Sequence, residues 1–239
     1  MRFCSGNGSL KRDQGNRGGE MGCFNGNGLA RKITAVLCAL VLAGCTGLRP
    51  VETDTAHTYL LEAQFDRAEQ ARPIPLTLVV SMPRAAPGYD TARMAYVRQP
   101  HLLEYFAKNR WADAPAKMLG PLLVRALEQR AGFRAVAPAA GMVKGDIRLD
   151  TELVLLQQDF TTSPSRVHLC LRTQLVEQAS RLVLATRVFE AYEDTPSDDP
   201  YGGVVATNRA LPRLLVQIAD FSAAQGVQSA GKNSRSYPE

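Results

Sequence analysis

The stretch Asp146–Gln157, DIRLDTELVLLQ, alternates apolar and polar residues along most of its length. Successive side chains of a β-strand point to opposite faces of the sheet. Four of its apolar side chains therefore fall on one side of an extended chain: Ile147, Leu149, Leu153 and Leu155. The pattern predicts a strand with one buried and one polar face.

Two segments that follow repeat this alternation. Arg166–Glu177 places Val167, Leu169, Leu171 and Leu175 on one face, and Leu182–Glu193 follows the pattern more loosely. The connection Gln178–Arg181 is short enough for a hairpin, and Ser163-Pro164-Ser165 lies in the other connection. The three segments predict an antiparallel meander.

Two helices are expected outside the meander. Asp113–Arg130 has its apolar side chains at helical spacing, with Asp113 as the predicted N-cap and Gly132 just past the end. A second helix is predicted over Gly203–Ala223. The inner faces are predicted to carry Leu119, Leu122, Leu123, Ala126 and Leu127 in the first helix and Leu211, Leu214, Leu215 and Ile218 in the second.

The segment before the first helix reads as extended chain. Thr58–Ala63 and Leu76–Met82 are predicted strands, and Arg93–Phe106 is a predicted hairpin that turns at Gln99-Pro100. The predicted fold class is therefore α+β: a single domain with a mixed or antiparallel sheet, a three-strand meander and two packing helices.

Near the N-terminus, an apolar run ends abruptly at a cysteine: VLCALVLAGCTG, residues 36–47. The run from Ile33 to Ala43 is about half of the 20 or so residues that span a membrane. Arg31-Lys32 precedes it, and small residues stand directly before Cys45, as in the lipobox of bacterial lipoproteins. We interpret residues 1–44 as a signal peptide, with Met21 as its true start, and Cys45 as the lipidated residue. The alternative is a buried core helix.

A short polar stretch, 45–57, then forms a lipidated tether before the domain, which we place at 58–223, and residues 224–239 form a polar tail that we expect to be disordered. Thr46 follows the predicted lipidated cysteine. Because Asp there would retain a lipoprotein in the inner membrane, Thr46 favours the periplasmic face of the outer membrane in a Gram-negative cell.

Removal of the leader changes what the composition implies. Residues 1–44 hold six of the 28 basic and two of the 23 acidic residues, so the remainder carries 22 basic against 21 acidic residues. The basic character therefore gives no reason to expect nucleic-acid binding. Cys170 is then the only cysteine besides Cys45, and we interpret it as a small apolar residue rather than a reactive thiol.

Motifs of catalysis and metal binding are missing from the sequence. Its three histidines, His57, His101 and His168, do not have the spacing of a zinc protease, and no P-loop or Gly-x-Ser-x-Gly motif occurs. We therefore expect no catalytic residue, no cofactor and no metal ion.

An aromatic and arginine-rich patch remains: Tyr96, Arg98, Tyr105, Arg110 and Trp111. Tyr, Trp and Arg are enriched at the energetic centres of protein interfaces. Two interpretations stay open at this point. The patch is either a docking surface, or a hairpin packed on the first helix with Trp111 in the core.

Several segments resemble the ABC-type transport auxiliary lipoproteins, among them the PqiC-like components of MCE lipid-transport systems. They are the lipobox at Cys45, the opening YLL at residues 59–61, the hairpin RMAYVR at 93–98, YFAKNRWADAPAKML at 105–119 and the closing ATNRALPRLLVQIADF at 206–221. Pro121 and the long C-terminal tail do not match the family's pattern.

The resemblance implies a non-enzymatic component of an intermembrane lipid-transport system. Its implied partners are an MCE-domain protein, the ABC permease and ATPase, the membrane through the N-terminal lipid, and further copies of the chain. The alternatives are a cell-envelope assembly adaptor unrelated to transport and a lipid-anchored enzyme.

Overall fold

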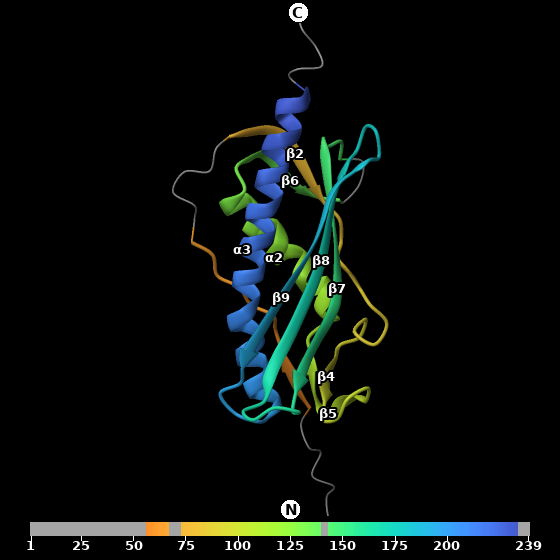
Figure 1. The fold of residues 1–239 in the computed structure, drawn as a ribbon. Coiled ribbons are helices and arrows are strands. Elements are labelled where there is room, and N and C mark those ends of the chain that lie inside the picture. The colour runs from red at the N-terminus through yellow and green to blue at the C-terminus, as the bar shows by residue number, and fades with distance from the viewer. Residues whose placement is uncertain (1–55, 67–72, 140–142, 234–239) are drawn as a thin grey trace, which may run out of the picture. The chain divides into compact units, whose positions relative to one another are not determined.

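One long strand organises the sheet of this computed structural model, which describes residues 56–66, 73–139 and 143–233 (Figure 1). The predicted signal peptide, the start at Met21, Cys45 and most of the tether lie outside these residues. The strands are β1 (His57–Tyr59), β2 (Ile74–Val80), β3 (Arg84–Ala85), β4 (Arg93–Val97), β5 (Leu103–Trp111), β6 (Phe133–Pro138), β7 (Ile147–Asp159), β8 (Arg166–Glu177) and β9 (Val183–Asp194). The helices are α2 (Pro115–Arg130) and α3 (Pro200–Asn233).

Strand β7 pairs with four other strands. On one side it runs antiparallel to β8 over its whole length, from Ile147 opposite Glu177 to Asp159 opposite Arg166. On its other side it pairs in parallel with β2, then β3, then β4. β9 continues the antiparallel pairing beyond β8. The predicted meander and the mixed sheet of an α+β domain are therefore confirmed.

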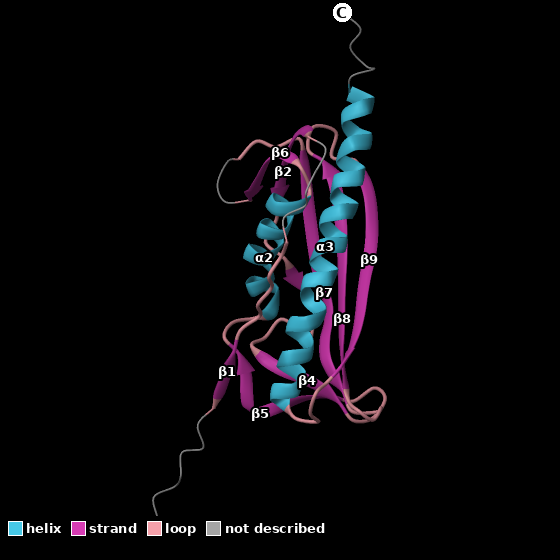
Figure 2. Ribbon diagram, turned by 90° about the vertical axis from the view of Figure 1, so that its left-hand side faces the viewer, coloured by secondary structure: helices cyan, strands magenta, loops and turns pink. Residues whose placement is uncertain are grey.

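Both helices lie on the same face of the sheet (Figure 2). α3 packs on β8, β9 and β2, and α2 packs on β6 and against α3. The predicted inner faces of the two helices are buried, including Leu123, Leu127 and Leu215 at 0 % exposure. The core lies within the unit that starts at Asp54, so this unit carries its own hydrophobic interior.

A β-bulge reverses the alternation inside β7. Leu153 lies opposite Leu171, but Leu155 lies opposite Cys170, so β7 contains one extra residue at this point. The inward face therefore passes from Leu153 to Leu156, which is 5 % exposed, and not to Leu155. The prediction that Leu155 belongs to the buried face is wrong, because the sequence period does not reveal the bulge.

The first strand is shorter than predicted. β1 ends at Tyr59, whereas the sequence predicted a strand to Ala63. Asn208 of α3 takes over the backbone here: its side-chain oxygen accepts from the Glu62 N–H at 3.1 Å, and its nitrogen donates to the Leu60 carbonyl at 3.2 Å. The Asn208 side chain thus bonds backbone groups that a neighbouring strand would otherwise bond. β1 also begins at His57, the last residue of the predicted tether.

The N-terminus of α2 is built without the predicted cap. Ala114 occupies the N-cap position, no side chain caps the helix, and Pro115 starts it, as proline at a first helical position commonly does. Asp113 instead accepts hydrogen bonds from the Ala114 N–H and the Lys117 ammonium. At the other end Gly132 has φ of 73°, the left-handed conformation that glycine adopts readily.

The helix α3 is longer than predicted, and residues 224–233 of the tail that we expected to be disordered are helical. It continues to Asn233, and residues 234–239 lie outside the described part. A stripe of small buried residues, Ser222, Gly226 and Ser229, faces the core. A β-carbon at residue 226 would lie 2.7 Å from the Phe133 ring, so glycine permits the close approach. Because the segment that follows residue 223 is mostly polar or small, its sequence did not indicate that one side of it packs on the core.

The sheet face away from the helices carries charged pairs. The guanidinium of Arg148 donates to both carboxylate oxygens of Asp150, with a shortest N–O distance of 2.9 Å, and the Ser81 hydroxyl donates to Asp150 at 2.6 Å. Burial alone would raise the pKa of Asp150, but the hydrogen bonds from Arg148 and Ser81 outweigh burial and hold it below its ordinary value.

We expect Leu156→Ala to cost about 2–5 kcal/mol of unfolding free energy, the usual range for a buried leucine. Leu155→Ala should cost at least about 1 kcal/mol less, because the bulge turns Leu155 away from the core. Urea denaturation of both variants measures the difference. Equal losses would show that the bulge does not set which leucine is inside.

Asp150 should make stability depend on pH in acid. A carboxyl with a lowered pKa stabilises the folded state above its unfolded pKa, about 3.9, and this contribution disappears as pH falls through the folded value. Asp150→Asn should therefore lower the unfolding free energy at pH 7 by about 1–3 kcal/mol and flatten its fall below pH about 4. Asp90→Asn, at an exposed position before β4, is the control. If the unfolding free energy of Asp150→Asn fell with decreasing pH as steeply as that of the wild type, this result would contradict the role of Asp150.

Candidate docking surface

The hairpin β4–β5 carries the residues that the sequence suggested as an interface. Tyr96 lies opposite Glu104, and Ala95 lies opposite Tyr105. Directly opposite residues share one face of a sheet and neighbours along a strand do not. Tyr96 and Tyr105 therefore lie on opposite faces of the hairpin, and the five residues do not form one patch.

On the helix side, Tyr96 belongs to an aromatic cluster. It is 8 % exposed, and its ring packs on Phe106 at a centroid distance of 4.5 Å and edge-on to Phe160 at 5.9 Å. Its hydroxyl donates to a carboxylate oxygen of Glu104 at 3.3 Å. The exposed Arg98 places its guanidinium 5.0 Å from the centre of the Tyr96 ring. Of Tyr96 and Arg98, only Arg98 is accessible to a partner.

Tyr105, on the other face, is half-buried and held in place. Its hydroxyl donates to the Gly88 carbonyl at 2.9 Å, and the guanidinium of Arg93 lies 3.8 Å from its ring centre. The Tyr105 ring thus connects β5 to the loop before β4, and the exposed Arg93 covers it. Arg93, the first residue of the motif RMAYVR, was not among the interface residues predicted from the sequence.

Trp111 is a core residue, with 3 % exposure. Its backbone N–H donates to the Ala92 carbonyl at 2.8 Å, so β5 is fixed at its end before α2 begins. Of the two interpretations left open for Trp111, the core position holds. Arg110, its neighbour, is exposed, and its guanidinium donates to the Thr58 hydroxyl of β1 at 3.4 Å.

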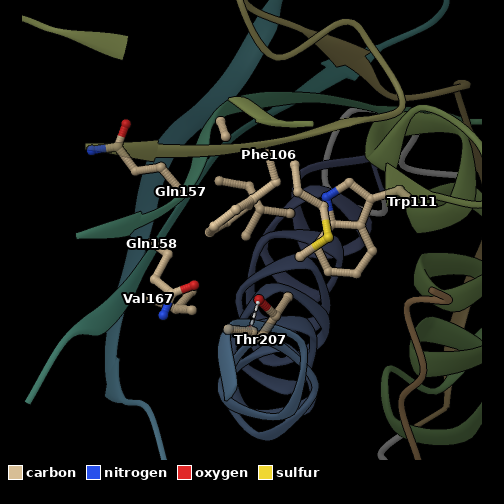
Figure 3. A pocket seen from close by; sticks show the side chains of 10 residues that line it. Phe106, Trp111, Gln157, Gln158, Val167 and Thr207 are labelled. Carbon is tan, nitrogen blue, oxygen red and sulfur yellow. Dashed lines mark hydrogen bonds between the residues drawn. The ribbon is translucent and has the colours of Figure 1, made fainter. Parts of the chain in front are cut away.

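Under the hairpin lies a cavity of about 10 Å³, lined in part by Phe106, Trp111, Gln158 and Thr207 (Figure 3). Its volume suits at most about one water molecule. The Gln158 amide nitrogen donates to the Ser165 hydroxyl at 2.9 Å, whereas its oxygen is buried without a hydrogen-bond partner among the described residues. This cavity is too small for a substrate. An open and largely apolar hollow of about 390 Å³ lies elsewhere, beside α2, and is lined in part by Met82, Pro121 and Val124.

A second polar cluster lies on the sheet face away from the helices. Glu190 bonds with His168 Nε2 and accepts from the Tyr192 hydroxyl at 3.1 Å, and the His168 and Tyr192 rings stack at 4.2 Å. The hydrogen bonds from His168 and Tyr192 lower the pKa of Glu190. Cys170 is buried beside them, and burial together with the charge of Glu190 raises the pKa of its thiol.

This cluster lacks an activated nucleophile. The thiolate, not the thiol, is reactive, and a raised pKa keeps Cys170 protonated. Among the residues that the structure describes, no group of His, Cys, Asp and Glu side chains could hold a metal ion. Within the same part of the chain, no helix is long and apolar enough to cross a membrane.

Comparison with solved structures supports the fold. Protein XCC0632 from Xanthomonas campestris is similar over 74 % of this chain and 99 % of that chain, with 21 % identity and a TM-score of 0.68. An uncharacterized protein is similar over 72 % and 98 %, with 16 % identity and a TM-score of 0.54. At these identities the likeness shows the fold alone. No curated protein matches.

The family model named ABC-type transport auxiliary lipoprotein component matches residues 59–219. The match starts at the last residue of β1 and stops inside α3, so it covers α2, the strands from β2 to β9 and the first part of α3. It spans more than half of the chain. The chain therefore belongs to the ABC-type transport auxiliary lipoprotein family.

Proposed function

We propose that this protein is a lipid-anchored, non-catalytic auxiliary component of an MCE-type system that moves lipids between the two membranes of a Gram-negative cell. The observation that carries the proposal is the family match over residues 59–219, together with the lipobox that ends at Cys45. Membership of the family implies an ABC transport system as the partner. The MCE-domain protein and the outer membrane are the finer part of the proposal.

The anchor is supported by the sequence around Cys45. A short apolar run and a preceding basic pair lead to small residues and then to the cysteine. Thr46, in place of an aspartate, favours release to the outer membrane. The domain begins at β1, so only a short tether separates the lipid from the sheet.

The non-catalytic part is supported by the chemistry of the described residues. The buried Cys170 is held as a thiol by its raised pKa, and its neighbour His168 is engaged by Glu190. The cavity under the hairpin has room for at most about one water molecule. These features favour a protein that works through contacts.

The docking surface is supported by the exposed arginines of the hairpin. Arg98 and Arg110 are exposed at different ends of the hairpin β4–β5. Within the domain, Arg98 makes a cation–π contact with Tyr96, and Arg110 donates a hydrogen bond to Thr58. Tyr105 and Arg93 form the accessible part of the other face. We assign partner contact to Arg98, Arg110 and Tyr105, and a supporting structural role to Tyr96 and Trp111.

We expect the mature protein to begin at a diacylglyceryl-modified Cys45. Mass spectrometry of protein purified from membranes should show this modification, since two or three acyl chains anchor stably. Cys45→Ala should leave the precursor unprocessed or release the chain from the membrane fraction. A mature protein that begins at another residue would contradict the anchor, and recovery in the inner-membrane fraction would contradict the outer-membrane part.

We expect Arg98→Ala and Arg110→Ala to weaken binding to the MCE-domain protein encoded beside this gene by more than about fivefold, since interface anchors typically contribute more than 1 kcal/mol. Their melting temperatures should stay near that of the wild type, because both side chains are exposed. A quantitative pull-down measures the affinity.

Arg209→Ala, at an exposed position of α3, is the matched control and should bind normally. Tyr96→Ala should instead lower the melting temperature. Full binding by both arginine variants would show that the hairpin is not the docking surface. The absence of an MCE gene, a permease gene and an ATPase gene nearby would favour the assembly adaptor.

A further inference from the structure

The hollow of about 390 Å³ beside α2 lies where the strands β2 and β6 end, and we call it the α2 hollow. The helix α2 packs next to both strands (Figure 2). Seven of the nine residues that line the hollow are apolar. Val80 and Gly120 are buried in its lining, whereas Met82 and Pro121 are exposed. A concave apolar surface of this size is typical of a site for a small ligand.

The sequence places two unusual helix residues at this hollow. Gly120 and Pro121 stand inside α2, although glycine and proline are the residues that least favour a helix interior. A β-carbon on residue 120 would lie 3.3 Å from the Met82 sulfur, so a larger side chain there would press into the hollow. Pro121 also departs from the family's sequence pattern. This wall of the hollow is therefore a feature of this chain.

The walls offer few groups that could bind a polar ligand. Pro121 and Pro138 have no backbone N–H, and the Ser81 hydroxyl already donates to Asp150 at 2.6 Å. The strand β2 has partners on both sides, β6 and β7, which bond its backbone. A peptide segment in the hollow would leave water without finding new hydrogen bonds, and this loss opposes its binding. A hydrocarbon chain has no hydrogen bonds to lose.

One cation lies beside this apolar surface. Arg125 lines the hollow and is exposed, one helical turn after Pro121. Its guanidinium has no ion pair or hydrogen bond with any described residue, whereas Lys117 and Arg130 of the same helix pair with aspartates. None of the nine described lining residues is acidic. An unpaired guanidinium here favours an anionic head group at the end of an apolar ligand.

We propose that the α2 hollow binds one acyl chain whose anionic head group pairs with Arg125. The 390 Å³ of the hollow corresponds to a single chain of about a dozen carbons, at about 30 Å³ for a group of the size of water or methylene. A free fatty acid and a lysophospholipid share this chemistry. Neither the docking surface nor the lipid anchor requires this ligand, so its test needs no transport partner.

Titration calorimetry on the unit Asp54–Glu239 measures the binding. This unit holds the whole described core and lacks Cys45, so no acyl chain of its own competes. The probes are fatty-acid anions of 8 to 16 carbons, each below its micelle concentration. The affinity should rise by at least about threefold for every two carbons from octanoate to dodecanoate, because each buried methylene adds to binding. From tetradecanoate to hexadecanoate it should rise by less than about twofold, because the hollow is then full.

Arg125→Glu tests the head group with two probes of equal chain length, dodecanoate and dodecyltrimethylammonium. The unsubstituted unit should prefer dodecanoate by at least about fivefold, and Arg125→Glu should prefer the cationic probe. Arg209→Glu, at an exposed position of α3, is the matched control and should keep the preference for dodecanoate. Lauroyl lysophosphatidylglycerol distinguishes the two sources: tighter binding than dodecanoate assigns a lysophospholipid, and weaker binding assigns a free fatty acid.

Two further substitutions test the place of binding. Val124→Trp should fill the hollow and weaken dodecanoate binding by at least about tenfold, whereas Val227→Trp on α3 should not. Circular dichroism checks the folding of each variant. Met82→Gln gives a second test that does not depend on core packing, because Met82 is 64 % exposed. It should weaken binding by at least about threefold, and Leu182→Gln, whose leucine is also 64 % exposed, should leave it unchanged.

The proposal would be overturned if no fatty-acid anion bound saturably. Binding that Val124→Trp and Met82→Gln both leave intact would also overturn it, because the chain would then lie elsewhere. A preference for dodecanoate that survives Arg125→Glu would show that Arg125 does not hold the head group. If Val124→Trp abolishes binding of an MCE-domain protein while the unsubstituted unit binds no fatty acid, a partner segment occupies the hollow and the acyl chain is the wrong ligand.

Discussion

The pairing of β7 with four strands is the constraint on which the rest of the domain depends. Its thirteen residues accept β8 along one side and β2, β3 and β4 in succession along the other. Each of these three strands meets a different part of β7. The parallel half of the sheet, which supports α2, and the hairpin β4–β5 are therefore placed by one strand, and a slip of one residue would turn every side chain to the opposite face.

The bulge in β7 shows how much the sequence can predict and where it stops. Alternation predicts β7, β8 and β9, because each has one face in water and one in the core. The same alternation places Leu155 inside, whereas Leu156 is buried. Beyond the bulge Gln158 also turns inward, next to the cavity under the hairpin. An extra residue in one strand is a property of the pair, so the sequence of one strand does not reveal it.

The ends of elements were predicted less well, for two physical reasons. β1 stops at Tyr59 because Asn208, far along the chain, bonds the backbone of the residues that follow. α3 continues beyond the apolar segment because Gly226 and Ser229 lie against the core without apolar side chains. For the candidate site, a two-residue turn at Gln99-Pro100 would pair Tyr96 with Leu103 and put Tyr96 and Tyr105 on one face. The observed pairing of Tyr96 with Glu104 differs by one residue and puts the two tyrosines on opposite faces, so the sequence pattern did not reveal their separation. The burial of Trp111 depends on β1 and α2, so the sequence of the hairpin alone does not reveal it.

The position of the helices determines where this protein can contact others. α2 and α3 cover one face of the sheet and bury the apolar side chains of β7 and β8. The opposite face is covered by ion pairs such as Arg148–Asp150 and by the His168–Glu190–Tyr192 cluster, whose hydrogen bonds are already satisfied within the chain. A face of this kind gains little on binding, because each charge would lose water without gaining a new partner. Exposed guanidinium groups remain at the hairpin, on Arg98 and Arg110, and a protein that acts through contacts would use this place.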